Sequence, residues 1–167
     1  MKKIIFLIIF FFNFNNLFAQ EEVFFLDVDF MLNNSKQGKI IIEKLKTLNS
    51  QNILELKKKE DELKKLESEI SNKKNIISKE EQNKMIDNLK KKINLYKSLK
   101  NEKVDNFTKL KNDEIEKFFK KITPFIEEFM RKNSIKIILD KKNIFIANSN
   151  YDITNQIVEF LNTKEIK

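Results

Sequence analysis

Four aspartates come closest, by residue type and spacing, to a chemical site in this sequence. Asp27 and Asp29 stand at the end of an apolar segment near the N-terminus, and Asp140 and Asp152 follow apolar segments near the C-terminus. Clustered carboxylates could hold a hard cation, but such sites need closely spaced oxygen ligands and a tight turn. The sequence has no loop motif of that kind. The aspartates are therefore interpreted as residues that end strands and cap helices.

The residue types that are missing exclude most enzymatic chemistry. The chain of 167 residues has no Cys, no His and a single Gly. Without thiols there is no disulfide and no thiol nucleophile, and without imidazole there is no serine triad and no His-based acid–base catalysis. A zinc site built from Cys and His is also excluded, as is a glycine-rich phosphate loop. We therefore expect a protein that is not an enzyme and uses no cofactor or metal ion.

Residues 1–19 are typical of a secretory signal peptide. Lys2 and Lys3 give a positively charged start, the nine residues Ile4–Phe12 are all apolar, and the small residue Ala19 stands where cleavage is expected. A transmembrane helix needs about 20 apolar residues, so an uncleaved membrane anchor is the less favoured alternative. The expected mature protein is exported and begins at Gln20.

The following residues predict a buried strand and then a long helix. Val23–Val28 is rich in β-branched and aromatic residues, as buried strands are. Asn34 as the N-cap, with Gln37 three residues later, would form a capping box that opens a helix. No convincing stop signal follows until about residue 72, so this helix is expected to be long.

A seven-residue repeat of apolar positions runs through this helix and indicates a coiled-coil seam. Seven of the eleven seam positions are apolar, namely Ile42, Leu45, Leu56, Leu63, Leu66, Ile70 and Ile77. The other four are polar, namely Asn49, Asn52, Lys59 and Lys73. A seam filled in this way predicts a helix that pairs loosely with its partner and can flex.

A second helix is expected from Glu80, after a hairpin turn within residues 71–78. Its apolar residues recur every three to four positions, which is the period of an amphipathic helix. Aromatic residues enrich it only in Phe107–Phe129, so denser packing is expected there. The two helices would form a long antiparallel hairpin.

The C-terminal part predicts a helix end and two further strands. Thr123 as a cap and Pro124 at the first helical position would kink or restart the second helix. Asn133 suits the left-handed residue that ends a helix. Ile135–Leu139 and Ile144–Ala147 then read as short strands around a turn.

The resulting fold class is α+β, with a small β body and one long antiparallel coiled-coil hairpin per chain. Asp152 would cap a final helix. The expected boundaries place the body at 20–42 and 118–167 and the hairpin arm at 43–117. Three short strands from one chain make a marginal sheet, so the body is expected to need association with other chains.

Net positive charge is concentrated in the expected hairpin. Glu55–Lys121 contains 20 Lys and 14 acidic residues, whereas the rest of the expected mature chain is neutral. Within it, Lys73–Lys111 contains 12 Lys and 5 acidic residues. Lysines often only solvate an exposed helix, but this asymmetry favours attraction of an anionic partner. Arg131 is the single arginine, so nucleic acid is not the expected partner.

Two sets of candidate binding residues follow from these patterns. The first set consists of lysines of the distal hairpin that would bind an anionic group or an acidic polypeptide: Lys73, Lys74, Lys79, Lys84, Lys90, Lys91, Lys92, Lys97 and Lys100. The second set consists of apolar residues along the sparse seam that would contact a bound polypeptide: Ile53, Leu56, Leu63, Leu89 and Ile93. Many weak contacts of this kind suit promiscuous binding.

The order of these elements resembles that of the Skp (OmpH-like) periplasmic chaperone family. The specific parts of the resemblance lie near the two ends of the chain: Phe25–Asp29, Ser35–Lys39 with the single glycine at the family's usual Gly, Ile137–Asp140, Ile144–Ala147 and Asp152–Thr154. Pro124 also matches, whereas Asn133 stands where a glycine is common. The lysine-rich middle matches only in length and character.

This resemblance implies a homotrimer in which short strands of three chains form the body and three hairpins surround a cavity. The body residues that it implies are Phe25, Leu26, Val28, Ile137, Leu139, Ile144, Phe145 and Ile146. The family holds unfolded outer-membrane β-barrel proteins in the periplasm without ATP. Two alternatives stay open: a structural coiled-coil spacer of the envelope, and a protein that binds lipopolysaccharide or anionic lipid.

Overall fold

The structure is a computed structural model that describes residues 23–165. The signal peptide expected at residues 1–19 lies outside this range. In chain order the elements are β1 (Val23–Leu26), α2 (Val28–Asn34), α3 (Lys36–Lys73), α4 (Lys79–Lys132), β2 (Ile137–Asp140), the short 3-10 helices η2 (Lys141–Asn143) and η3 (Ser149–Tyr151), and α5 (Thr154–Asn162).

The chain divides into two compact units, which we call the body and the arm. The body consists of residues 23–31 and 124–164, and the arm is Leu32–Thr123. The α4 helix contributes residues to both units, because the boundary falls at Pro124. The shorter arm expected from the sequence, 43–117, stays a prediction for the assembled protein.

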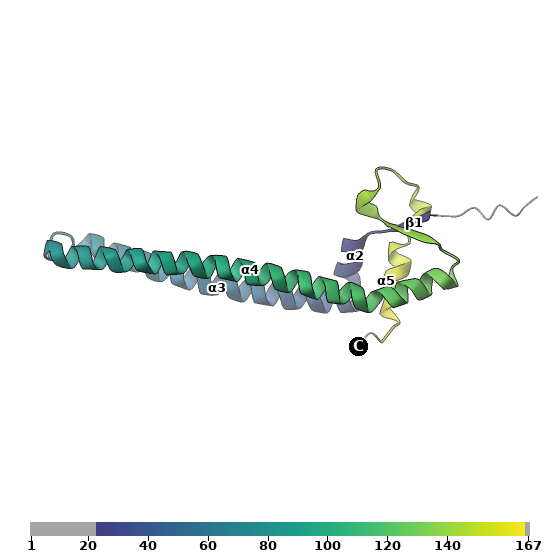
Figure 1. The fold of residues 1–167 in the computed structure, drawn as a ribbon, viewed down its shortest axis with the longest axis horizontal. Helices are drawn as coiled ribbons and strands as arrows, with labels where there is room; N and C mark the ends of the chain where they lie inside the picture. The colour runs from purple at the N-terminus through teal and green to yellow at the C-terminus, as the bar shows by residue number, and fades with distance from the viewer. Residues whose placement is uncertain (1–22, 166–167) are drawn as a thin grey trace, which may run out of the picture. The chain divides into compact units, whose positions relative to one another are not determined.

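The arm is an antiparallel pair of long helices, α3 and the first part of α4, which lie side by side (Figure 1). The α3 helix has 38 residues and is therefore about 57 Å long. Its N-cap is Ser35, whose hydroxyl accepts the Gly38 backbone N–H at 3.2 Å. The predicted cap at Asn34 is wrong by one residue, because Asn34 still belongs to α2, a helix that the sequence pattern did not reveal.

Burial along α3 confirms the predicted seam. All seven apolar seam residues are buried or half-buried, six of them on α3 and Ile77 in the turn that follows it. Of the polar ones, only Asn52 is half-buried, and its side-chain oxygen accepts a hydrogen bond from the Lys103 ammonium at 3.3 Å. Lys103 also pairs with Glu55 at 2.7 Å. The middle of the seam is therefore closed by polar contacts rather than by apolar packing.

In the body, strands from opposite ends of the chain pair in parallel. Val23 lies opposite Ile137 and Leu26 opposite Asp140. The other edge of β1 carries a bridge to Asp152, and the Ile153 backbone N–H donates to the Phe25 carbonyl at 3.0 Å. These contacts place β1 between two C-terminal segments.

The core of the body forms around α5. The Ile157 and Leu161 side chains are fully buried, as is Met31. Apolar residues recur along α5 at helical spacing, so one face enters the core. The Phe129 ring meets the Phe160 ring edge-on at 5.4 Å between centroids, which joins α4 to α5. The body thus has the packing of a small globular domain.

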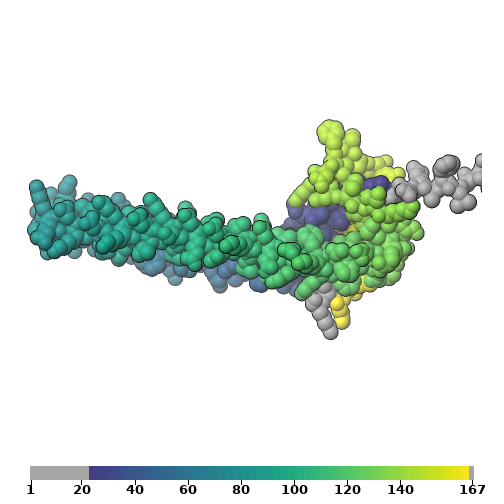
Figure 2. All heavy atoms as spheres, viewed as in Figure 1, coloured from purple at the N-terminus to yellow at the C-terminus, as the bar shows by residue number. Residues whose placement is uncertain are grey.

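The predicted third strand, Ile144–Ala147, is absent. The backbone at Ile144 is extended, with φ −110° and ψ 120°, but no segment among the described residues pairs with it. A strand needs a neighbouring ladder, so extended residues alone do not make one. The described sheet has two strands. The Phe145 side chain is fully exposed, and the Ile146 side chain is 84% exposed. The surrounding segment stands at the surface (Figure 2).

Two predicted breaks around the end of α4 are also wrong in detail. The helix continues through Pro124, and the Thr123 hydroxyl donates to the Phe119 carbonyl instead of capping a new helix. The left-handed residue after α4 is Ser134, with φ 56°, and not Asn133. The Asn133 side chain instead donates to the Phe129 carbonyl at 2.8 Å.

Three of the four aspartates act at the ends of elements, as predicted. The Asp27 carboxylate accepts the Phe30 backbone N–H at 2.8 Å at the start of α2, and Asp140 accepts the Lys142 N–H at 3.0 Å. Asp152 stands one residue before the α5 cap position and accepts the Thr154 N–H. No group of three or more metal-ligating side chains is found within residues 23–165.

Candidate functional site

The nine predicted anion-binding lysines are all exposed on the arm. Lys84 pairs with Glu80 at 2.9 Å, and Lys90 pairs with Asp87 at 3.6 Å. The other seven form no ion pair within 4.0 Å of any described residue: Lys73, Lys74, Lys79, Lys91, Lys92, Lys97 and Lys100. Exposed helical ion pairs are weak, so even the two pairs leave those lysines available to another anion.

Lysines closer to the end of the arm at Thr123 form ion pairs of the same exposed helical kind. Lys117 pairs with Asp113 at 2.7 Å, and Lys120 pairs with Glu116 at 2.6 Å. Hydrogen bonds to these carboxylates raise the pKa of both lysines. The two helices are joined there by Lys44 and Glu114 at 2.9 Å. Ion pairs thus form in both halves of the arm, and the excess of lysines over acidic residues within Lys73–Lys111 is what leaves the distal half positively charged.

The five predicted apolar contact residues do not form one surface. Ile53 is exposed, whereas the other four are half-buried in the seam. Leu63 lines one groove, and Ile53 and Leu56 line another of about 360 Å³. The seam pattern missed five exposed apolar residues of the arm because they lie off the main apolar stripe: Ile40, Leu54, Ile76, Leu95 and Val104.

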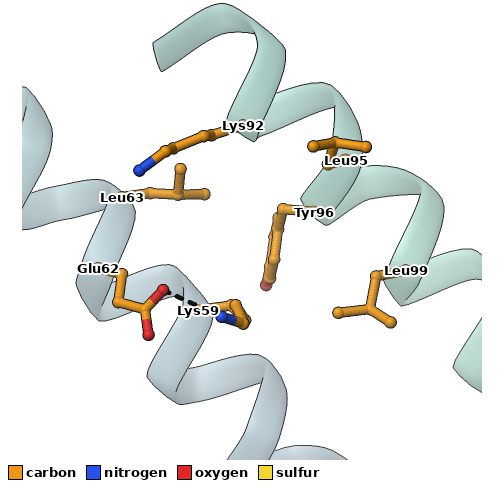
Figure 3. A pocket seen from close by; sticks show the side chains of 7 residues that line it. All are labelled: Lys59, Glu62, Leu63, Lys92, Leu95, Tyr96 and Leu99. Carbon is orange, nitrogen blue, oxygen red and sulfur yellow. Dashed lines mark hydrogen bonds and ion pairs between the residues drawn. The ribbon is translucent and has the colours of Figure 1, made fainter. Parts of the chain in front are cut away.

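A groove of about 390 Å³ opens between α3 and α4 in the distal half of the arm. We call it the Tyr96 groove; it is lined by Lys59, Glu62, Leu63, Lys92, Leu95, Tyr96 and Leu99. The Tyr96 ring stands between the two helices, and Lys92 extends from α4 across Leu63 (Figure 3). Lys59 pairs with Glu62 at 3.1 Å. The groove therefore combines an apolar lining with charged groups at its rim.

The body also carries apolar side chains at its surface. Phe25 and Leu26 are buried, and Val28 and Ile144 are half-buried. The remaining predicted body residues are exposed: Ile137, Leu139, Phe145 and Ile146. Val23 and Phe30 add to this surface, and β2 has no strand partner on its outer edge among the described residues. An unpaired apolar edge is a surface suited to association with another chain.

A charged cluster fastens the end of α5 to α4 within the body. The Lys164 ammonium contacts both oxygens of Glu128 at 2.8 Å and lies 4.5 Å from the centre of the Phe160 ring. Lys132 pairs with the same carboxylate at 2.8 Å. Hydrogen bonds from Lys132 and Lys164 lower the pKa of Glu128 to about 2. This cluster stabilises the fold and has no nucleophile or general base beside it.

Comparisons with known proteins agree with this architecture. No helix among the described residues is long and apolar enough to span a membrane. Among curated proteins, none is significantly similar in sequence. A crystal structure of a proposed outer membrane chaperone (OmpH-like) from Caulobacter crescentus CB15 has the same fold, with a TM-score of 0.73 at 19% identity over 87% of this chain and 86% of that one.

The family comparison covers both the body and the arm. The model of the family described as Outer membrane protein (OmpH-like) matches residues 22–161, which is most of the chain and nearly all of the described part. The match includes the paired strands, the hairpin and most of α5. The chain belongs to the OmpH-like outer membrane protein family.

Proposed function

We propose that this protein is a periplasmic, ATP-independent holdase chaperone that binds unfolded outer-membrane β-barrel proteins and prevents their aggregation in transit. Family membership supports the chaperone role, and the predicted signal peptide at residues 1–19 supports export. The observation that carries the proposal is the distal arm, where exposed apolar side chains and lysines that form no ion pair with a described residue occur together on one hairpin.

Physical chemistry connects this surface to that client. Unfolded β-barrel chains alternate apolar and polar residues, and they aggregate when their apolar side chains meet in water. Uncompensated lysines would accelerate the encounter with acidic segments, and scattered apolar residues would supply weak, interchangeable contacts. The loosely filled seam would let the arm adapt to clients of different size. None of these steps needs a nucleotide or a metal ion.

The exposed apolar surface of the body supports a homotrimer. Phe145, Ile146 and the outer edge of β2 are the residues that we propose to lie at the subunit contacts. In such an assembly Ile144–Ala147 would obtain the strand partner that it lacks within one chain. A Phe145→Asp/Ile146→Asp variant is expected to dissociate, as measured by analytical ultracentrifugation. A variant that sediments like the wild type would contradict this contact.

The direct test of the holdase uses the chain from Gln20 to Lys167, which keeps every described residue. A urea-unfolded β-barrel protein is diluted into it without ATP, and aggregation is followed by light scattering at low and high salt. We expect suppression near three chains per client, weakened by salt because exposed charges are screened. A well-folded sample that never suppresses aggregation would overturn the proposal and favour the envelope spacer.

Charge variants separate the role of the lysines from that of the fold. Lys91→Glu/Lys97→Glu is expected to slow client association about tenfold at low salt, as for other steered complexes. Lys117→Glu/Lys120→Glu is the matched control, since those lysines are already paired. An equal loss of association rate in both variants would show that total charge, and not the position of the lysines, sets the rate.

A second candidate function is binding of lipopolysaccharide or another anionic lipid. The seven lysines without an ion pair to described residues favour it, because a phosphate-rich surface would pair with them. Sedimentation with anionic vesicles in the presence of client distinguishes the two roles. Competition would indicate a shared surface on the arm.

A further inference from the structure

A lysine occupies the seam position beside the Tyr96 groove. Lys59 is one of the four polar seam residues; its side chain lines the groove, is half exposed and pairs with Glu62 (Figure 3). A leucine there would fill the space beside Tyr96. The result is a hollow with a preformed apolar lining, and Leu95 at its edge is 70% exposed.

The size of this hollow limits what can enter it. Its volume of about 390 Å³ lies near the lower end of ligand pockets, which measure about 300–1,000 Å³. It accommodates one or two large side chains and is too small for a helix. Leu63, Leu95, Leu99 and the face of the Tyr96 ring favour an apolar and preferably aromatic group.

The rim of the groove specifies the charge of the occupant. Lys92 has no ion pair with a described residue and lies over Leu63 (Figure 3). Lys59 has Glu62 as a competing partner, whereas a carboxylate on Lys92 displaces no ion pair with a described residue, so Lys92 is the preferred cation. Glu62 would repel a phosphate headgroup but can accept backbone N–H groups, which favours a polypeptide over a lipid.

We propose that the Tyr96 groove is a docking site for an extended client segment that places an aromatic side chain in the hollow and a carboxylate on Lys92. Side chains two residues apart in an extended chain share one face, so an aromatic residue followed two positions later by Asp or Glu fits. This inference rests on the proposed holdase function and names the sequence feature that the arm selects.

The absence of Cys and Trp from the chain allows a clean labelling test. Leu95→Cys carries a benzophenone photo-crosslinker at the groove, and Val104→Cys, which replaces a 55% exposed residue of the same helix, is the matched control. The probe is a synthetic peptide of about ten residues, the length of a barrel strand, with alternating Ser and Phe and one Glu two positions after a Phe.

The crosslinking yield at position 95 is expected to be about tenfold above that at position 104, because only position 95 borders the groove. Replacing the Phe residues of the peptide by Ala should bring the yield to the control level. Equal yields at the two positions, or an Ala peptide that labels as well as the Phe peptide, would overturn the proposal. The proposal would also be overturned if lysophosphatidylglycerol saturated the Tyr96 groove under conditions in which the peptide is not crosslinked to it.

A filling variant tests the groove without weakening the arm. Lys59→Leu restores an apolar seam residue, so it should raise the melting temperature and reduce labelling at Leu95→Cys about tenfold. Lys58→Leu, an exposed neighbour, makes the same charge change and should label normally. If the peptide still labels Leu95→Cys normally when Lys59→Leu is also present, the Tyr96 groove is not the docking site. If the unlabelled wild type still suppresses client aggregation, the holdase function stands although the groove does not.

Discussion

The body and the arm bury their apolar side chains in different ways. In the body, α5 and the segments around it bury several side chains completely, including Ile153, Ile157 and Leu161. In the arm, no described residue of α4 between its start and Lys117 is buried. The body is a globular core in which packing sets stability, whereas the distal arm is a two-helix seam in which nearly every side chain keeps contact with solvent.

This difference shows how one chain combines a stable region with an adaptable surface. Two helices alone cannot enclose a side chain on all sides, so the arm leaves apolar residues such as Leu95 accessible. The body encloses its core but leaves Phe145 and the β2 edge unpaired within the described chain. The same exposure in the two regions serves different proposed partners: a client on the arm and a second copy on the body.

The largest difference between the body and the arm is expected in the stability lost when a side chain is truncated to alanine. Ile157→Ala in the body should lower the free energy of unfolding by about 3 kcal/mol, because it opens a cavity in an enclosed core. Leu63→Ala in the arm should cost about 1 kcal/mol, since that side chain is already partly solvated. Urea unfolding followed by circular dichroism, at one protein concentration, measures both. Equal losses of unfolding free energy in the two variants would contradict the difference in packing between the body and the arm.

One arm position is expected to behave like a core position. A Cβ atom at Gly38 would lie 1.8 Å from the Leu32 carbonyl oxygen, so Gly38→Ala must displace backbone. We expect a loss of about 2 kcal/mol. Lys39→Ala, at the exposed neighbouring position, should change stability by less than about 0.5 kcal/mol. A neutral Gly38→Ala variant would show that α2 and α3 can separate freely.

The Glu128 cluster predicts a pH dependence confined to the body. Folding lowers the pKa of Glu128 from 4.5 to about 2, so its carboxylate stabilises the fold above pH 4.5 and loses that effect as the pH falls toward 2. Glu128→Gln should therefore lower the melting temperature by a few degrees at pH 7 and by almost nothing at pH 2. Glu127→Gln, at an exposed position of the same helix, is the control. If the difference in melting temperature between Glu128→Gln and the wild type does not change with pH, the lowered pKa of Glu128 is contradicted.

The smallest expected effect concerns the polar part of the seam. Asn52→Leu should strengthen the middle of the arm by less than about 1 kcal/mol, since an apolar side chain replaces a half-buried amide. Hydrogen exchange of the surrounding α3 amides should then slow about threefold. Asn49→Leu is the matched comparison, because Asn49 is exposed and should give no change. Faster exchange in Asn52→Leu would mean that the Lys103 contacts hold the hairpin together.

Much of this architecture could be predicted from local pattern. The heptad repeat from Ile42 to Ile77 and the three-to-four spacing after Glu80 gave both long helices, because an apolar stripe at helical period must face a partner. The lysine excess placed the charge on the arm. Capping chemistry was less decisive: Asn34 and Ser35 are both good caps, and the structure extends α2 through Asn34 and makes Ser35 the cap of α3.

By itself, the sequence determined the helices, the sparse seam, the basic distal arm and the exclusion of Cys and His chemistry, because these depend on residue type and period alone. The tertiary structure decided which residues meet: β1 with β2 in parallel, Asn52 with Lys103, and Tyr96 beside the space that Lys59 leaves open. It also decided that Ile144–Ala147 forms no strand within the described chain. Such outcomes depend on register and on neighbours distant in the chain, which local periodicity does not encode.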